Sequence, residues 1–298
     1  GLQLMFLKYV INPYFCPLKF RNTFPSMKRF IYLAILSLVL VSSCSEYQKA
    51  LKSEDVATKF KYGTELYDAG KYNKANRLFE QIVPKYRGKP QAEKLMFMHA
   101  DAFYQTKDYY IAGYQFENFQ RSYPQSEKAE EATFLGAKSY YQLSPVYSKE
   151  QKETIEALEK LQLFVNKYPN SQYLPEANKL IRELDYKLER KAFEIAKQYN
   201  QIAYFESSDY EAAIKAFDNF LIEYPGTSFR EAAMFYRLDS AYRLGINSVS
   251  FKKEERLNTA KNYYDTFKRF YPNSEYIAEA DKMNDEMTAA LEELNTKT

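Results

Sequence analysis

The sequence contains few of the residues from which most catalytic and phosphate-binding sites are built. It has no tryptophan, one histidine, two cysteines and only eight glycines in 298 residues. Both cysteines, Cys16 and Cys44, precede the region with helical periodicity, which excludes a disulfide framework. Because glycine is scarce and alternating apolar runs are missing, little material remains for β-hairpins or for glycine-rich phosphate loops.

Charge is close to balanced, whereas aromatic residues are abundant. The 42 basic and 39 acidic residues leave a net charge of +3, which is too small to favour nucleic acid as a partner. Hydrophobic residues make up 46% of the chain and charged residues 27%, a balance typical of folded proteins in water. The 29 tyrosines and 22 phenylalanines favour helices that pack through large rings.

Residues 27–43 have the features of a signal peptide. Two cations precede a short apolar run from Phe30 to Val41, and small residues follow it. The run has about a dozen residues, whereas a helix needs about 20 to cross a bilayer. The pattern therefore predicts a cleaved signal. We interpret residues 1–26 as a translation-start artefact or an extension lost on processing, so that Cys16 has no role.

The signal peptide ends in Val41-Ser42-Ser43-Cys44, which resembles a bacterial lipobox. The resemblance implies that the Cys44 thiol carries diacylglycerol, that the signal is cut before it, and that the new amino group is acylated. Several acyl chains together anchor a protein stably in a membrane. Ser45 is not the Asp of an inner-membrane retention signal, so we expect outer-membrane attachment facing the periplasm. The alternative is a secreted protein with a chance cysteine.

A tetrapeptide of the form Tyr-Pro-X-Ser/Thr occurs four times, and its prolines are Pro124, Pro169, Pro225 and Pro272. Each copy is expected to end a helix, because the residue before proline avoids the α conformation. The Ser or Thr that follows is a predicted N-cap of the next helix. Successive prolines are 45, 56 and 47 residues apart by subtraction, so longer helices and loops must extend the 34-residue repeat period.

A second pattern precedes each of these prolines, with a small residue twelve positions earlier and a large one eight positions earlier. The small residues are Ala112, Ala157, Ala213 and Ala260, and the large ones are Phe116, Leu161, Phe217 and Tyr264. A small side chain allows two antiparallel helices to touch, and a large one a turn later fills the space beside it.

An earlier unit lacks the proline but keeps the rest of the pattern in Gly63, Gly70, Ala75 and Phe79. Here the sequence resembles the tetratricopeptide repeat, with a small residue in the first helix, a turn at Gly70, and Ala and Phe in the second helix. We therefore predict an all-α, right-handed tetratricopeptide-repeat solenoid of about five helix pairs plus a C-terminal capping helix.

The expected organisation follows the repeats. We assign residues 44–54 to a tether, residues 55–174 to N-terminal repeats 1–3, and residues 175–298 to C-terminal repeats 4–5 and the capping helix. The stretch from Pro175 to Tyr204 has no helix breaker and is predicted to be one long helix. Polar breaks at 143–153 and 245–254 are expected to separate the two helices of their repeats.

Five such repeats behind a lipobox resemble the BamD (YfiO-like) family, lipoproteins of the outer-membrane β-barrel assembly machinery, over residues 27–290. The resemblance implies a non-enzymatic scaffold whose C-terminal repeats bind a BamA-like barrel assembly protein. It also implies that the N-terminal repeats receive unfolded outer-membrane protein substrates. Other assembly lipoproteins are further implied partners, and no cofactor is implied. The alternative is a periplasmic adaptor for cell-division or cell-wall machinery, although such adaptors usually carry a coiled-coil arm that the sequence lacks.

Candidate peptide-groove residues can be projected onto the concave side of the repeats by fixed offsets from the small residues Gly63, Ala100 and Gly136. They are Phe60, Thr64, Tyr67 and Asp68 in the first unit, Phe97, Asp101, Tyr104 and Gln105 in the second, and Tyr140 and Tyr141 in the third. Aromatic rings with a few polar groups suit an extended peptide. The alternative is core or inter-repeat packing, since an alignment error of one residue turns a helical position by about 100°.

No catalytic or metal-binding motif occurs in the sequence, which lacks His-Glu-X-X-His, Gly-X-Ser-X-Gly and Walker-type patterns. His99 has no nucleophile arranged around it, and we interpret it as a packing or surface residue. The paired acids Glu130-Glu131 and Glu254-Glu255 point apart on a helix and are expected on solvated faces. We therefore do not expect an enzyme, because the alternative, an envelope enzyme, has no segment left for a catalytic domain.

Overall fold

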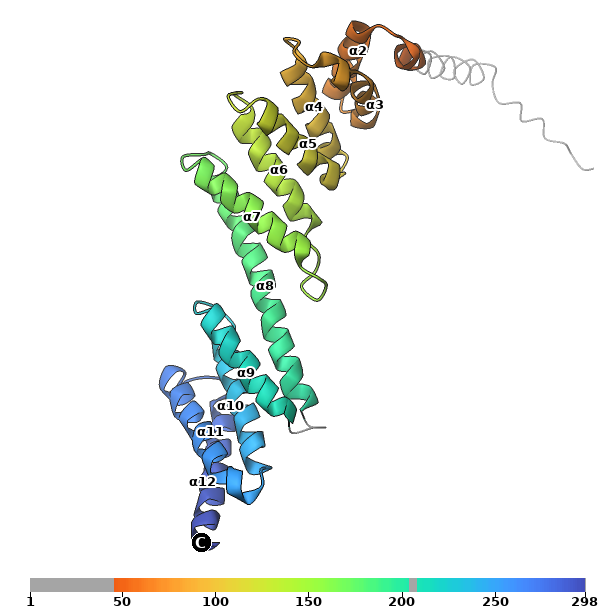
Figure 1. Ribbon diagram of the computed structural model, residues 1–298. Coiled ribbons are helices and arrows are strands. Elements are labelled where there is room, and N and C mark those ends of the chain that lie inside the picture. Colours follow the sequence, from red (N-terminus) through yellow and green to blue (C-terminus); the bar gives the residue numbers. More distant parts are fainter. Residues whose placement is uncertain (1–45, 204–207, 298) are drawn as a thin grey trace, which may run out of the picture. The chain divides into compact units, whose positions relative to one another are not determined.

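The computed structural model describes residues 46–203 and 208–297 of the chain (Figure 1). The predicted signal peptide at 27–43 and the predicted lipidation site Cys44 lie outside the described residues. All regular structure in the described ranges is helical, and no strand occurs in them. The all-α class predicted from the sequence is therefore confirmed.

The chain divides into two compact units, residues 1–59 and residues 60–298. In the first unit, residues 46–52 are helical, within the segment expected to act as a tether. Helix α2 (Val56–Asp68) begins in this unit. Its first turn is capped by Asp55, whose carboxylate accepts two backbone N–H groups.

The second unit is a series of helix pairs that follow one another along the chain (Figure 1). The pairs are α2 with α3 (Tyr72–Ile82), α4 (Ala92–Gln105) with α5 (Tyr109–Ser122), α6 (Ala129–Leu143) with α7 (Lys152–Lys167), α8 (Leu174–Ile202) with α9 (Ser208–Glu223), and α10 (Arg230–Ile246) with α11 (Ser250–Phe270). A 3-10 helix, η1 (Val83–Tyr86), follows α3, and α12 (Ile277–Lys297) follows α11. Helices pack mainly on their sequence neighbours, which confirms the predicted repeat solenoid with a final helix.

Small residues allow the paired helices to approach closely, as their spacing predicted. Gly63 of α2 faces Phe79 of α3, and a Cβ at Gly63 would lie 2.6 Å from the nearest ring atom. Gly70 has a φ of +70° in the turn between these helices, a conformation that favours glycine. The other residues of the pattern are buried, namely Ala75, Ala112, Ala157, Ala213, Ala260, Phe116, Leu161, Phe217 and Tyr264.

The Tyr-Pro-X-Ser/Thr tetrapeptide ends a helix in all four copies, as predicted. Tyr123, Tyr168 and Tyr271 are C-caps with φ of −133°, −125° and −133° and positive ψ, outside the helical region. In every copy the tyrosine N–H donates to the carbonyl of the residue four positions earlier. The prolines at 124, 169, 225 and 272 therefore follow the last hydrogen-bonded turn of their helices.

The hydroxyl of this tetrapeptide is not the helix N-cap that the sequence predicted. Helix α6 begins after Lys128, whereas Ser126 lies two residues earlier. Ser126 Oγ accepts the Lys128 N–H at 3.0 Å and so closes a turn ahead of the helix. Ser126 also donates to Glu93 of α4 at 2.5 Å, and Ser171 donates to Glu130 of α6 at 2.6 Å. The N-cap prediction is wrong because these hydroxyls bond within the turn and to the preceding repeat.

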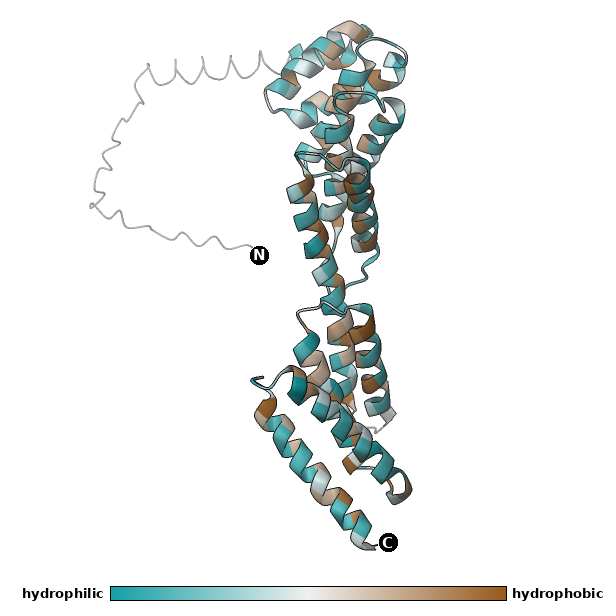
Figure 2. Ribbon diagram, turned by 90° about the vertical axis from the view of Figure 1, so that its left-hand side faces the viewer, coloured by the Kyte–Doolittle hydropathy of each residue, from teal (hydrophilic) through white to brown (hydrophobic). Residues whose placement is uncertain are grey.

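Helix α8 is continuous over 29 residues, which confirms the long helix predicted from Pro175 onward. Leu180 and Leu184 belong to a hydrophobic core with α6 and α7, whereas Phe193 and Ala196 belong to a core with α9 and α10. No residue of α8 between Leu184 and Phe193 is buried, so this helix links two cores. Figure 2 shows hydrophilic and hydrophobic residues on the same helices, as expected of helices that bury one face.

Candidate functional site

The first helices of repeats 1–3, α2, α4 and α6, together with the N-terminal half of α8, carry a surface that we call the A face. Its first contact joins Tyr67 of α2 to Asp101 of α4, where the tyrosine hydroxyl donates to the carboxylate. Gln105 donates to the other carboxylate oxygen at 3.1 Å, and Asp101 is only 7% exposed. Burial and the bond to Asp101 raise the pKa of Tyr67, so the phenol remains a donor at neutral pH. Repeats 1 and 2 are therefore joined through a buried carboxylate.

The second contact of the A face joins three helices. Tyr104 of α4 lies beside Lys138 of α6, and Lys138 pairs with Glu176 of α8 at 2.7 Å. Burial raises the pKa of Tyr104. Sequence reasoning identified Tyr104 but missed Lys138 and Glu176. The interval of 34 residues between Tyr67 and Asp101 recurs between Tyr104 and Lys138, and this spacing is the signal that could have found the lysine.

The third contact separates two residues that the sequence placed together. Tyr141 of α6 donates to Glu183 of α8, and this bond, with burial, raises the pKa of Tyr141 to about 12. The ring of Tyr140 instead lies against Gly113 of α5, with Lys160 of α7 over it. The structure thus directs Tyr141 towards α8 and Tyr140 towards α5 and α7, since successive helical residues point about 100° apart.

The remaining predicted groove residues divide between packing and exposure. Phe60 stacks on Tyr86 at 5.3 Å between ring centroids, and Phe97 meets two phenylalanines of α5 edge-on at 5.9 and 5.6 Å. Phe60 and Phe97 each keep part of their surface exposed. Thr64 donates to the backbone carbonyl of Phe60 at 2.9 Å, whereas Asp68 is exposed. The predicted groove residues thus supply both ring surface and exposed polar groups.

The C-terminal repeats contain related contacts that sequence reasoning missed. Tyr242 of α10 donates to Glu286 of α12. These two residues are 44 positions apart, so a search for the 34-residue spacing of Tyr67 and Asp101 does not find them. Asn200 of α8 donates to Asp239 of α10 at 2.7 Å, and Arg243 pairs with the same carboxylate at 2.7 Å. Asp239 is 5% exposed, so its two polar partners offset the cost of burying the charge.

His99 is a packing residue, one of the two roles that its sequence context favoured. Its Nδ1 lies 2.8 Å from the Asn76 Oδ1, and its ring contacts Phe103 edge-on. Burial lowers the pKa of His99 to about 4, so the imidazole is uncharged at neutral pH. In the described residues no group of three or more His, Cys, Asp or Glu side chains could hold a metal ion. The described helices also include none long and apolar enough to cross a membrane.

Comparison with known proteins identifies the family. Residues 52–202, just over half of the chain, match the YfiO family, which is described as an outer membrane lipoprotein. The chain belongs to the YfiO family. Among solved structures, it is similar to a complex of the TPR2AB domain of yeast Sti1 with pHSP90, at 15% identity and a TM-score of 0.36, covering 78% of this chain and 98% of that one. A DHF58 filament is similar at 11% identity and a TM-score of 0.14, covering 88% and 97%. No curated protein matches the chain.

The YfiO match ends at Ile202, which is also the last residue of α8. It therefore includes all three A-face contacts, those of Tyr67, Tyr104 and Tyr141. The Tyr242–Glu286 contact between α10 and α12 lies beyond the matched YfiO residues.

Proposed function

We propose that this YfiO-family chain is a non-enzymatic scaffold of the outer-membrane β-barrel assembly machinery. In this proposal Cys44 carries the lipid that holds the chain at the outer membrane, facing the periplasm. The N-terminal repeats hold segments of unfolded outer-membrane proteins, and the C-terminal repeats bind a BamA-like barrel protein. The observation that carries the proposal is the YfiO match, which includes the whole of α2, α4, α6 and α8, the helices that carry the A face.

The A face offers the groups that bind an extended chain. Phe97 and Tyr104 are partly exposed, and large rigid rings give contact area at a low cost in conformational entropy. Asp68 and Gln105 are exposed and can accept from or donate to the backbone of an unfolded segment. Rings and backbone-directed polar groups tolerate many side-chain sequences, which suits a receptor for many client chains.

The contacts between repeats hold this surface in one arrangement. The Tyr67–Asp101 bond fixes α2 to α4, and the Lys138–Glu176 pair fixes α6 to α8. A surface that is ordered before binding avoids part of the entropy cost of association. The same bonds therefore stabilise the fold and prepare the A face for its client.

The C-terminal repeats expose large apolar side chains that a protein partner could cover. Val249 and Phe251, which are 56% and 83% exposed, lie at the turn between α10 and α11. Ile222 of α9 is 79% exposed and Phe270 of α11 is 56% exposed. Large apolar residues are enriched at protein–protein interfaces, so these positions are the first to test for contact with a barrel protein.

Crosslinking in cells followed by affinity purification of the full chain tests the proposal. We expect outer-membrane protein precursors and a BamA-like protein among the captured partners. The double variant Val249→Ser/Phe251→Ser should lose the barrel protein and keep the precursors. The matched control is Val146→Ser, which removes a valine of similar exposure, 61%, from a loop of the N-terminal repeats. Complexes without any barrel-assembly component would refute the proposal, and recovery of cell-wall or division proteins would favour an adaptor.

A further inference from the structure

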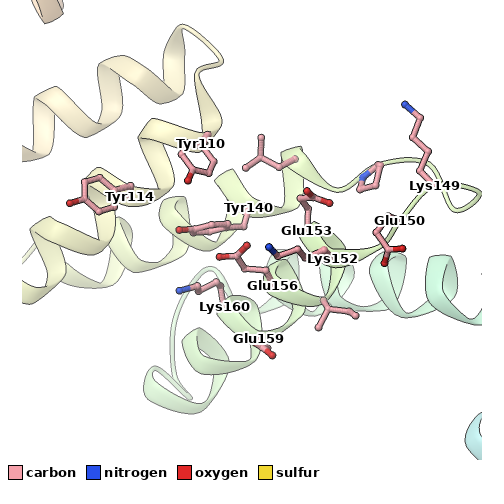
Figure 3. A pocket seen from close by; sticks show the side chains of 13 residues that line it. Tyr110, Tyr114, Tyr140, Lys149, Glu150, Lys152, Glu153, Glu156, Glu159 and Lys160 are labelled. Carbon is pink, nitrogen blue, oxygen red and sulfur yellow. The ribbon is translucent and has the colours of Figure 1, made fainter.

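A hollow of about 1110 Å³ lies where the second helices α5 and α7 flank α6. Tyr110 and Tyr114 of α5 stand at one wall and are 72% and 52% exposed. Figure 3 shows them on one side of Tyr140, with Glu156 and Lys160 of α7 on another. None of the lining residues takes part in the A-face contacts, so this hollow is a separate surface.

Tyr140 forms the floor of the hollow because Gly113 makes room for it. A Cβ at Gly113 would lie 2.9 Å from the Tyr140 Cε2, so a larger residue would displace the ring from α5. Tyr140 is 9% exposed. Burial and the nearby carboxylates of Glu117 and Glu156 raise its pKa, so the phenol stays protonated. The floor is therefore a neutral aromatic ring beside two acids.

The chain already places one cation against this floor. The Lys160 ammonium lies 5.2 Å from the centre of the Tyr140 ring and pairs with Glu117 at 2.6 Å. The other charged residues that line the hollow are Glu150, Glu153, Glu156 and Glu159, with Lys149 and Lys152. None of these four glutamates forms an ion pair with another described residue. With Lys160 paired to Glu117, the lining keeps an excess of negative charge.

We propose that the hollow between α5 and α7 binds an extended basic segment of a partner protein, with an arginine side chain seated against Tyr110, Tyr114 and Glu156. The exposed faces of the tyrosines attract a cation through their ring electrons. A planar guanidinium can also stack on a ring while it donates to a carboxylate, which a lysine ammonium does less well. The bound arginine would thus contact a tyrosine ring and a glutamate together, as Lys160 does with Tyr140 and Glu117.

The occupant is a peptide segment because the hollow continues along α6. A second hollow of about 510 Å³ lies between the same helices and shares Lys160 with the first. Leu163, which is 63% exposed, and Ile155, which is 49% exposed, supply apolar contacts along this path. Arg121 and Lys167 line the second hollow, so the charge of the surface changes sign along its length. An extended segment with a basic residue at Glu156 and an acidic or apolar residue near Arg121 and Lys167 complements the charge of both hollows.

Fluorescence anisotropy with the full chain and two labelled peptides tests the site. The first peptide carries an arginine flanked by leucines, and the second replaces the arginine with citrulline, which has nearly the same shape and no charge. We expect the arginine peptide to bind about tenfold more tightly, corresponding to about 1.4 kcal/mol. The variant Tyr110→Ala/Tyr114→Ala should remove the difference, and Glu156→Gln should reduce it.

The controls separate this surface from the A face. Tyr199→Ala removes a 39% exposed tyrosine from α8 and should leave the preference for arginine unchanged, as should Tyr104→Ala on the A face. Circular dichroism of each variant confirms that it folds. Equal affinity for the two peptides, or no measurable binding of either, overturns the proposal. So does an arginine preference that survives loss of Tyr110 and Tyr114, or one that Tyr104→Ala abolishes.

Discussion

Replacing Tyr67 with phenylalanine tests how strongly the first two repeats are joined. The change removes only the hydroxyl that donates to Asp101, and it leaves Gln105 as the donor to that carboxylate. Asp101 is 7% exposed, so water replaces the lost donor poorly. Hydrogen bonds to charged groups contribute about 1.5–3 kcal/mol, and we expect a loss in the free energy of unfolding within that range.

Urea unfolding followed by circular dichroism measures this loss. With a slope of about 1–3 kcal/mol per molar urea, the midpoint should fall by roughly 1 M. The matched control is Tyr141→Phe, because its acceptor Glu183 has a 43% exposed side chain and can exchange the tyrosine for water. That variant should lose less than about 1 kcal/mol.

A double-mutant cycle with Asp101→Asn isolates the contact from other effects of the two changes. A coupling energy between Tyr67 and Asp101 of about 1 kcal/mol or more is expected. Equal losses in Tyr67→Phe and Tyr141→Phe, or a coupling energy near zero, would show that burial of the acceptor does not decide the strength of these contacts.

Three further predictions follow from the fold. Ala112→Leu overfills a fully buried position and should cost about 1–3 kcal/mol in thermal or urea unfolding, whereas no loss would contradict the close packing of α4 and α5. Lys107 has a φ of 63° in the same kind of turn that Gly70 occupies with 70°, so Lys107→Gly should raise stability by about 0.5–1 kcal/mol and Gly70→Ala should lower it. Burial lowers the pKa of His99 from 6.5 to about 4, so its contribution to stability is present above pH 6.5 and is lost as the pH falls through 4. His99→Gln should flatten the stability of the chain over that pH window, and an unchanged profile would contradict the buried neutral histidine.

The repeats could be predicted because their signals are local. The prolines of the Tyr-Pro tetrapeptide end helices through their own geometry, and Ala112 and Phe116 lie one turn apart on one helix face. The polar breaks expected near 143–153 and 245–254 contain the observed loops at 144–151 and 247–249. These breaks could be predicted because they too depend on residues close together in the sequence. Composition and spacing within a single helix are sufficient for such features.

The site was harder to predict because it depends on contacts between repeats. Tyr140 was grouped with Tyr141, yet it faces Gly113 and Lys160 while Tyr141 bonds to Glu183, since one residue along a helix turns the side chain by about 100°. Lys138 was missed because its role appears only when α4, α6 and α8 lie side by side. The Ser126 hydroxyl was predicted to cap the helix that follows it, whereas it donates to Glu93 in the preceding repeat. Partners more than 30 residues apart are not specified by any local pattern.

The central claim is that the A face receives unfolded outer-membrane proteins. Site-specific photocrosslinking in cells tests it most directly, with the photoreactive residue at Tyr104 and a matched one at Tyr199 of α8, in the full chain with Cys44 intact. The account predicts adducts with outer-membrane barrel precursors from Tyr104 and far fewer from Tyr199. Precursor adducts at equal levels from both positions, or adducts from Tyr104 only with cell-wall or division proteins, would contradict it.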